Sequence, residues 1–123
     1  MPTLATGIDL IEIERLQETI RRYGERFLLR VFTPGELSEV AGNSSSLAAR
    51  FAAKEAVAKA LGTGIGPVSW REIEILRGPA RQPMLHLHGA ARQLAEEQGL
   101  TLWSLSLSHT HSVAVASVVA LSG

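Results

Sequence analysis

Hydrophobic and polar positions change their spacing several times along the chain, and each change marks an expected element. Alternating or β-branched apolar runs predict strands over residues 4–10, 70–76, 83–88, 102–108 and 112–121. Apolar positions three or four apart predict helices over residues 13–29 and 89–98, and Thr33 before Pro34 predicts a further short helix. One strand, then helices, then mainly strands is the order of an α+β domain.

A central helix is predicted over residues 47–61. Seven alanines lie between Ala48 and Ala60, and alanine is the best helix former. Ser46 is expected to cap the N-terminus of this helix and Gly62 to end it. One stripe carries only small side chains, against which another backbone could pack closely: Ala49, Ala53, Ala56 and Ala60.

Charged residues occupy two other flanks of the central helix. Glu55 and Lys59 lie four residues apart on one flank, and Arg50 and Lys54 share the second. One carboxylate among three cations, with Thr63 just past the helix end, would suit a metal-bound polyphosphate. The alternative is a solvated helix face with one i,i+4 ion pair.

Asp9 is a second candidate for metal chemistry, because it interrupts an apolar segment predicted to form a buried strand. Burying a carboxylate is costly unless a cation or hydrogen-bond donors satisfy it. Asp9 and Glu55 could together bind Mg²⁺ and leave coordination positions for phosphate oxygens and water. Alternatively, the strand ends early and Asp9 caps the helix that follows.

Length and composition narrow the class of protein. The 123 residues fit one domain, 1–123, and 46% hydrophobic with 20% charged residues is a globular composition. A net charge of zero favours neither nucleic acid nor a membrane surface as partner, and the absence of cysteine excludes disulfides and thiolate sites. Without a signal peptide or a spanning apolar run, the expected location is cytoplasmic.

Charge is nevertheless uneven along the chain. Residues 15–30 contain five arginines and two glutamates, a local net charge of +3. This pattern fits the docking of an acidic partner, or simply a solvated helix. The basic residues are Arg15, Arg21, Arg22, Arg26 and Arg30.

The four histidines form two His-x-His pairs, 86/88 and 109/111, either of which could chelate Zn²⁺ from one face of a strand. No acidic residue or cysteine is near either pair in the sequence, and His86 and His88 alternate with Leu85 and Leu87, so the polar face of a half-buried strand is the favoured interpretation of this pair. His109 differs because it ends a strand among hydroxyl groups, a setting suited to phosphate contact or proton transfer.

Four motifs in order resemble those of the holo-acyl-carrier-protein synthases, the small trimeric branch of the 4′-phosphopantetheinyl transferases. The resemblance extends over essentially the whole chain and implies their fold, a mostly antiparallel sheet packed with a long central helix. The motifs are Gly7-Ile8-Asp9 with Arg15; Phe32-Thr33 with Glu36-Leu37; residues 50–56 with Lys59-Ala60-Leu61-Gly62; and Ser106-Leu107-Ser108-His109-Thr110.

The resemblance implies transfer of 4′-phosphopantetheine from coenzyme A to a serine of apo-acyl carrier protein in fatty acid biosynthesis, with release of 3′,5′-ADP. Asp9 and Glu55 would bind Mg²⁺, and Lys59 would steady or protonate the leaving phosphate. The base for the serine is left open between Glu55, Asp9 and a metal-ordered water. Seven residues would line the nucleotide and its phosphates: Arg50, Lys54, Gly62, Thr63, Ser108, His109 and Thr110.

The resemblance also gives the basic segment a partner, since acyl carrier proteins are acidic. The expected docking residues are Arg15, Arg22, Arg26, Phe27 and Arg30. A homotrimer with the active site between subunits is implied, and it would explain why residues 113–120 are apolar on both sides of one strand. An ordinary buried strand is the other explanation.

Two departures from the family pattern concern the nucleotide. The usual short turn between the middle strands is expanded to residues 78–83, and the loop 42–46 contains no basic residue. Two other functions stay open: a transferase for polyketide or peptide synthase carriers, and a non-catalytic module of the same fold that binds coenzyme A or a nucleotide.

Overall fold

A three-stranded antiparallel sheet and a long helix form the frame of the α+β fold in the computed structural model, which describes residues 2–123. The strands are β1 (Leu4–Glu12), β4 (Leu100–His109) and β5 (Val113–Ser122), in the order β1-β5-β4. In the register, Asp9 is opposite Ala116, which is opposite Leu107. A separate hairpin pairs β2 (Ile73–Arg77) with β3 (Pro83–Leu87).

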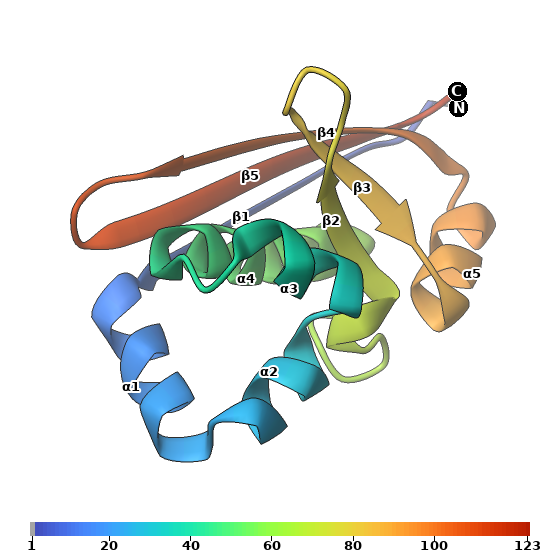
Figure 1. Cartoon of the computed structure of the whole chain (residues 1–123). Coiled ribbons are helices and arrows are strands. Elements are labelled where there is room, and N and C mark those ends of the chain that lie inside the picture. The colour runs from blue at the N-terminus through green and yellow to red at the C-terminus, as the bar shows by residue number, and fades with distance from the viewer. Residues whose placement is uncertain (1) are drawn as a thin grey trace.

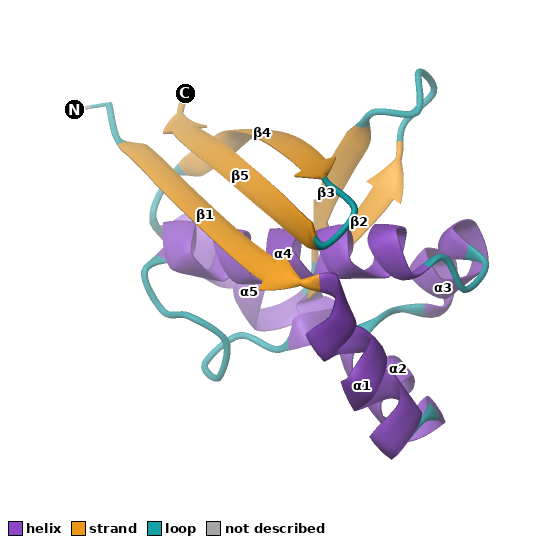
Figure 2. Cartoon of the chain, turned by 90° about the vertical axis from the view of Figure 1, so that its left-hand side faces the viewer, coloured by secondary structure: helices purple, strands orange, loops and turns teal. Residues whose placement is uncertain are grey.

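Helix α4 (Ser44–Leu61) lies across one face of the three-stranded sheet (Figures 1 and 2). The stripe of alanine side chains on this helix allows its backbone to approach strand β1 closely. Ala53 and Ala56 have no exposed surface, and a Cβ atom on Gly7 of β1 would collide with the carbonyl oxygen of Ala56. The prediction of close backbone packing is therefore confirmed, and it requires glycine at position 7.

The remaining helices lie on the same side of the sheet as α4 (Figure 2). Their bounds are α1 (Ile13–Tyr23), α2 (Glu25–Val31), α3 (Pro34–Val40) and α5 (Gly89–Glu97), with a 3₁₀ turn, η1 (Trp70–Glu72), before β2. The prediction of one helix over 13–29 is wrong, because the backbone turns at Gly24, with φ of 59°, and starts a new helix. Residues 70–72 likewise form the 3₁₀ turn instead of the start of a strand.

Helix ends confirm most of the capping predictions. Thr33 forms a capping box with Glu36, Pro34 begins α3, and Gly62 ends α4 in the left-handed region. The N-cap of α4 is Asn43 rather than Ser46, since the Asn43 side chain accepts a hydrogen bond from the Ser46 backbone N–H at 2.9 Å. Both residue types cap helices well, so composition alone does not fix the choice.

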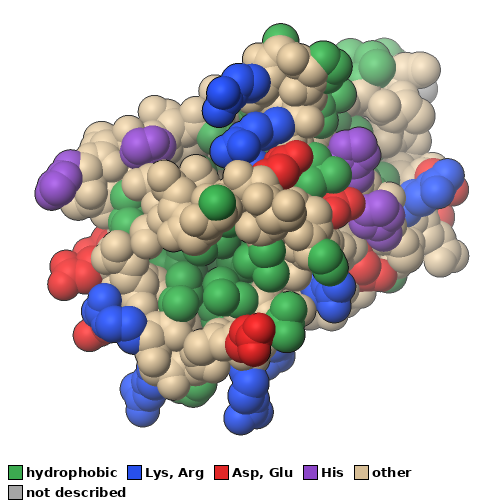
Figure 3. All heavy atoms as spheres, in the orientation of Figure 1, with side chains coloured by type: hydrophobic (Ala, Val, Ile, Leu, Met, Phe, Trp, Pro, Cys, Tyr) green, Lys and Arg blue, Asp and Glu red, His purple; other side chains and the backbone are tan. Residues whose placement is uncertain are grey.

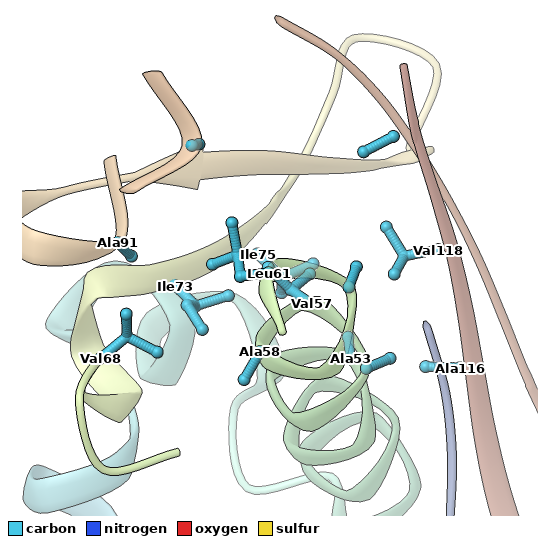
Figure 4. Close-up of a cluster of buried hydrophobic side chains, with 14 of the residues drawn as sticks. Ala53, Val57, Ala58, Leu61, Val68, Ile73, Ile75, Ala91, Ala116 and Val118 are labelled. Carbon is cyan, nitrogen blue, oxygen red and sulfur yellow. The ribbon is translucent and has the colours of Figure 1, made fainter. Parts of the chain in front are cut away.

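The core lies where α4 meets the sheet on one side and the β2 hairpin on the other. Val57, Ile73 and Ile75 are completely or almost completely buried there, and Val118 of β5 packs against the same cluster (Figure 4). The opposite face of the three-stranded sheet is left uncovered by residues 2–123 (Figure 2). It exposes six large apolar side chains: Leu4, Ile8, Leu10, Leu102, Val119 and Leu121.

None of the helices within residues 2–123 combines the length and hydrophobicity that crossing a bilayer requires.

Candidate active site

Asp9 is an integral part of strand β1 and points to the α4 side of the sheet. The strand continues to Glu12, so the alternative in which Asp9 caps a helix is wrong. Its side chain is only 14% exposed. Lys59 of α4 lies 3.1 Å from Asp9 Oδ1 and also donates to the Ile8 carbonyl oxygen at 2.9 Å.

Glu55 faces the same cavity as Asp9, a space of about 360 Å³ also lined by Arg15, Phe27 and Phe51. Burial raises the pKa of Glu55 above its ordinary value, and the neighbouring Asp9 carboxylate raises it further, whereas Lys59 lowers it. We call Glu55 and Lys59 of α4, together with Asp9 of the adjacent β1, the open flank of α4. Its two carboxylates repel each other and share a single nearby ammonium group, which is 53% exposed.

The open flank fits a magnesium ion by its donor chemistry. Two carboxylates supply hard oxygen ligands, and Mg²⁺ usually takes one or two of these and completes its shell with water and substrate phosphates. No group of three or more His, Cys, Asp or Glu side chains suited to a metal is found among residues 2–123. His88, which lies between β3 and α5, instead contacts Glu74 of β2 at 2.9 Å.

Arg50 and Lys54 form the opposite flank of α4, and their charges are already satisfied. Lys54 has no exposed surface, and its ammonium donates to Glu36 Oε1 at 2.8 Å and to the carbonyl oxygens of Trp70 and Ile73 at 3.0 and 2.6 Å. The expectation that Lys54 contacts a nucleotide is therefore wrong. Burial lowers the pKa of Lys54, and the Glu36 carboxylate opposes that shift.

Arg50 is 5% exposed and donates to the Ile75 carbonyl oxygen at 3.0 Å and to Glu39 Oε1 at 2.9 Å. We call Arg50, Lys54, Glu36 and Glu39 the saturated flank. It joins α3 and α4 to β2, and the sequence patterns did not reveal the structural roles of Glu36 and Glu39. Glu36 belongs to the second of the four motifs that resemble those of the family, and this was the available signal.

A second cavity, of about 260 Å³, lies beside the saturated flank. Arg50, Ser108 and His109 all line it, so three of the predicted nucleotide residues come together. Arg77 and Arg81 of the β2–β3 hairpin line it too, although the sequence patterns assigned them no role. Two of the other predicted residues, Gly62 and Thr63, lie outside both cavities, beyond Lys59 at the C-terminal end of α4.

Thr110 shapes the turn between β4 and β5 rather than lining this cavity. Its hydroxyl accepts from the Val113 backbone N–H at 3.1 Å and from the Ser112 N–H at 3.3 Å. The turn sets the position of His109, which ends β4.

The two cavities lie on different sides of α4 in one chain. Arg50 and Glu55 are five residues apart, which separates their directions by about 140° around a helix. Accordingly, the carboxylates lie near the β1 edge of the sheet and His109 ends the strand at the β4 edge. A single subunit therefore does not unite the metal candidates with the predicted nucleotide residues.

The basic helices adjoin the carboxylate cavity. Phe27 lines it and also lines a neighbouring hollow with Arg26 and Arg30, while Arg15 lies on the side of α1 that faces Glu55. Figure 3 shows apolar side chains gathered between α1 and α2, with both basic and acidic side chains at the edge of this area. Arg22 lies farther along α1, in a shallow depression with Arg15.

Comparison with known proteins gives consistent matches over nearly the whole chain. Residues 5–116 match the family model of the 4′-phosphopantetheinyl transferase superfamily. The holo-[acyl-carrier-protein] synthase of Herpetosiphon aurantiacus is 48% identical over 96% of this chain and 98% of its own length. That of Moorella thermoacetica is 52% identical over 92% of this chain and 90% of its own length.

A solved structure gives the same result for the fold. The Helicobacter pylori holo-[acyl-carrier-protein] synthase, crystallised with coenzyme A, superposes with a TM-score of 0.86 at 34% identity, covering 94% of this chain and 98% of that one. Sequence, fold and the arrangement of the motif residues agree, and the chain belongs to the 4′-phosphopantetheinyl transferase superfamily.

Proposed function

We propose that this chain is a magnesium-dependent holo-acyl-carrier-protein synthase, which transfers 4′-phosphopantetheine from coenzyme A to a serine of apo-acyl carrier protein and releases 3′,5′-ADP. The observation that carries this proposal is the open flank of a family member, where Asp9 and Glu55 line one cavity and Lys59 lies 3.1 Å from Asp9 Oδ1. A module that only binds a nucleotide would not need two carboxylates that repel each other beside a half-exposed lysine.

Asp9 and Glu55 would hold the magnesium ion. When bound, the ion supplies positive charge that stabilises the negative charge gathering on the leaving phosphate. Without it, the two carboxylates would repel the pyrophosphate of coenzyme A. The metal assignment thus also explains why this chain places two acidic side chains where a polyanion must bind.

Lys59 is suited to the leaving phosphate. Its side chain is half exposed and is held by Asp9 and one carbonyl oxygen, so it can turn to a phosphate oxygen when the metal ion takes its place beside Asp9. In that position Lys59 would neutralise or protonate 3′,5′-ADP as it departs.

The carrier protein would dock on α1 and α2. Arg26 and Arg30 line the hollow that opens beside Phe27, and this hollow is continuous with the carboxylate cavity through Phe27 and Thr19. Arg15 lines the carboxylate cavity itself. An acidic partner seated there would bring its serine toward Glu55. Arg22 extends the same positive surface along α1.

A homotrimer would complete the site. The uncovered face of the sheet, defined above by Leu4 and five other apolar residues, is too hydrophobic to favour exposure to water. In β5, Ala114 and Ala116 face α4 and are buried, but Val119 on the other side is 44% exposed, so the ordinary buried strand is excluded. Packing between copies would cover this face and could bring the open flank of one subunit to the nucleotide cavity of another.

Intact-protein mass spectrometry of an apo-acyl carrier protein, incubated with this chain, coenzyme A and Mg²⁺, tests the reaction. The expected result is a gain of one phosphopantetheine that EDTA abolishes, and assays with fatty acid, polyketide and peptide carriers would rank the partners. A folded enzyme that modifies none of these carriers would contradict the proposed function. A cytoplasmic role in fatty acid biosynthesis follows from the proposed partner.

A further inference from the structure

The expanded turn between β2 and β3 places Arg81 in the lining of the second cavity, which we call the nucleotide cavity because Arg50, Ser108 and His109 also line it. Figure 1 shows this hairpin rising beside β4, the strand that ends with His109. Arg81 has a φ of 66°, a left-handed conformation that is uncommon for a residue with a side chain. Its N–H donates to the Gly78 carbonyl oxygen at 2.8 Å, and the Gly78 N–H donates to the Gln82 carbonyl oxygen at 2.7 Å. The turn is therefore internally fixed around an unfavourable residue conformation.

Arg81 differs from the other arginines of this cavity in its partners. Arg50 donates to Glu39 and to a carbonyl oxygen, and Arg77 donates to the Glu39 carbonyl oxygen at 3.1 Å. Within residues 2–123, the Arg81 guanidinium makes no hydrogen bond or salt bridge. All of its donors are available to an anion.

Apart from the exposed Arg77, the other positive charges in this region are absent or already engaged. The loop 42–46 contains no basic residue. Lys54 is fully buried with all its donors engaged, and Arg50 is held by the saturated flank. An anion entering this cavity would meet the Arg81 guanidinium with no competing partner, the exposed Arg77, which is held only through Nη1, and the side chains of Ser108 and His109, which line the same space.

We propose that Arg81 determines specificity for the substrate by binding the 3′-phosphate of coenzyme A. This inference rests on the proposed function. The pyrophosphate must lie at the carboxylates of the open flank, which leaves the 3′-phosphate as the anionic group that remains for a separate cavity. Guanidinium binds phosphate in a bidentate manner, and the apolar surfaces of Ile75, Leu76 and Pro83 beside it suit the attached nucleoside.

Comparing coenzyme A with 3′-dephospho-coenzyme A tests this assignment, because the two substrates share the pyrophosphate and differ only in the 3′-phosphate. Arg81→Gly removes the side chain and also relieves the left-handed conformation, and Arg81→Lys retains the charge. We expect Arg81→Gly to lower kcat/KM for coenzyme A roughly tenfold and to leave that for the dephospho substrate unchanged. Arg81→Lys should retain part of the preference, and Arg92→Gly, on exposed α5, should change neither value.

An equal loss with both substrates would show that Arg81 supports the hairpin or the pyrophosphate, and would overturn the proposal. So would an unchanged preference in Arg81→Gly. If the wild-type chain transfers nothing, the proposed function fails on its own. In that case calorimetry, which compares the binding of 3′,5′-ADP with that of 5′-AMP, tests whether Arg81 binds the 3′-phosphate. Loss of discrimination between these nucleotides in Arg81→Gly would support the site, whereas equal discrimination in variant and wild type would refute it.

Discussion

The two charged flanks of α4 contain similar side chains and serve opposite purposes. On the saturated flank, Lys54 and Glu36 are completely buried and bind each other and the backbone. On the open flank, Glu55 lacks a cation of its own and Lys59 is half exposed. Charged residues on a helix therefore do not by themselves identify a catalytic site. Charged side chains that lack a full set of partners and lie beside a cavity are the better indicator.

Removing a carboxylate of the open flank should have the largest effect. Asp9→Ala and Glu55→Ala should each lower the transfer rate by at least roughly a hundredfold, because each removes a proposed metal ligand at the centre of developing charge. Circular dichroism should show an unchanged fold. Glu97→Ala, which removes an exposed carboxylate of α5, is the matched control and should keep full activity. Near-normal transfer in Asp9→Ala or Glu55→Ala would break the metal assignment.

Removing a lysine from each flank sharpens the contrast. Lys54→Met leaves the Glu36 carboxylate buried without its cation and should cost about 3–5 kcal/mol of unfolding free energy. Lys59→Met removes an exposed ion pair and should change that free energy by less than about 1 kcal/mol, while slowing transfer. Urea denaturation and steady-state kinetics measure the two quantities. A stable Lys54→Met protein, or a fully active Lys59→Met enzyme, would reverse the roles assigned to the flanks.

Reversing a charge beside the open flank should affect carrier binding alone. Arg26→Glu should raise KM for the carrier protein several-fold, with little change in KM for coenzyme A, and added salt should shrink the difference. Arg71→Glu reverses a charge outside the docking surface and serves as the control. If KM for coenzyme A rises instead, α2 is not the docking surface.

The smallest effect is a difference in pH dependence between the flanks, measured by unfolding in EDTA. The raised pKa of Glu55 means that the folded chain binds more protons than the unfolded chain above pH 4.5, so its contribution to stability is lost as pH rises through the folded pKa. Burial would raise the pKa of Glu39, but the Arg77 backbone N–H and Arg50 lower it overall. The Glu39 contribution is therefore present above pH 4.5 and is lost as pH falls through the folded pKa.

Substitution separates these two contributions. Glu55→Gln should flatten the decline of stability on the alkaline side of pH 4.5, and Glu39→Gln should flatten the decline on the acidic side. If the unfolding free energies of the two variants depend on pH in the same way, the carboxylates of the two flanks do not have oppositely shifted pKa values.

Much of the fold could be predicted from local patterns, because strand alternation, alanine content and the glycine after α4 act over a few residues. The break at Gly24 could not, since a glycine within a helical pattern ends the helix only when neighbouring elements require the turn. The candidate site divides in the same way. Asp9, Glu55 and Lys59 meet because β1 and α4 are both predictable, and Gly7 brings them together.

Lys54 is buried because other elements cover its side of α4. The spacing of residues in the sequence does not show which elements these are. Arg50 and Lys54 share a flank by helical periodicity, but only the position of β2 shows that this flank is enclosed. Arg81 was missed for a related reason: an expanded turn has no periodicity from which the direction of its residues can be predicted.

Calorimetric titration of Mg²⁺ into the chain saturated with coenzyme A tests the central claim most directly. The account predicts one ion per subunit, bound by the wild type and by Glu39→Gln but not by Glu55→Gln, because Glu55 lines a cavity together with Asp9, whereas Glu39 already accepts from Arg50 and the Arg77 N–H. Magnesium binding that persists in Glu55→Gln, or that depends on Glu39, would contradict the division of α4 into a catalytic and a structural flank.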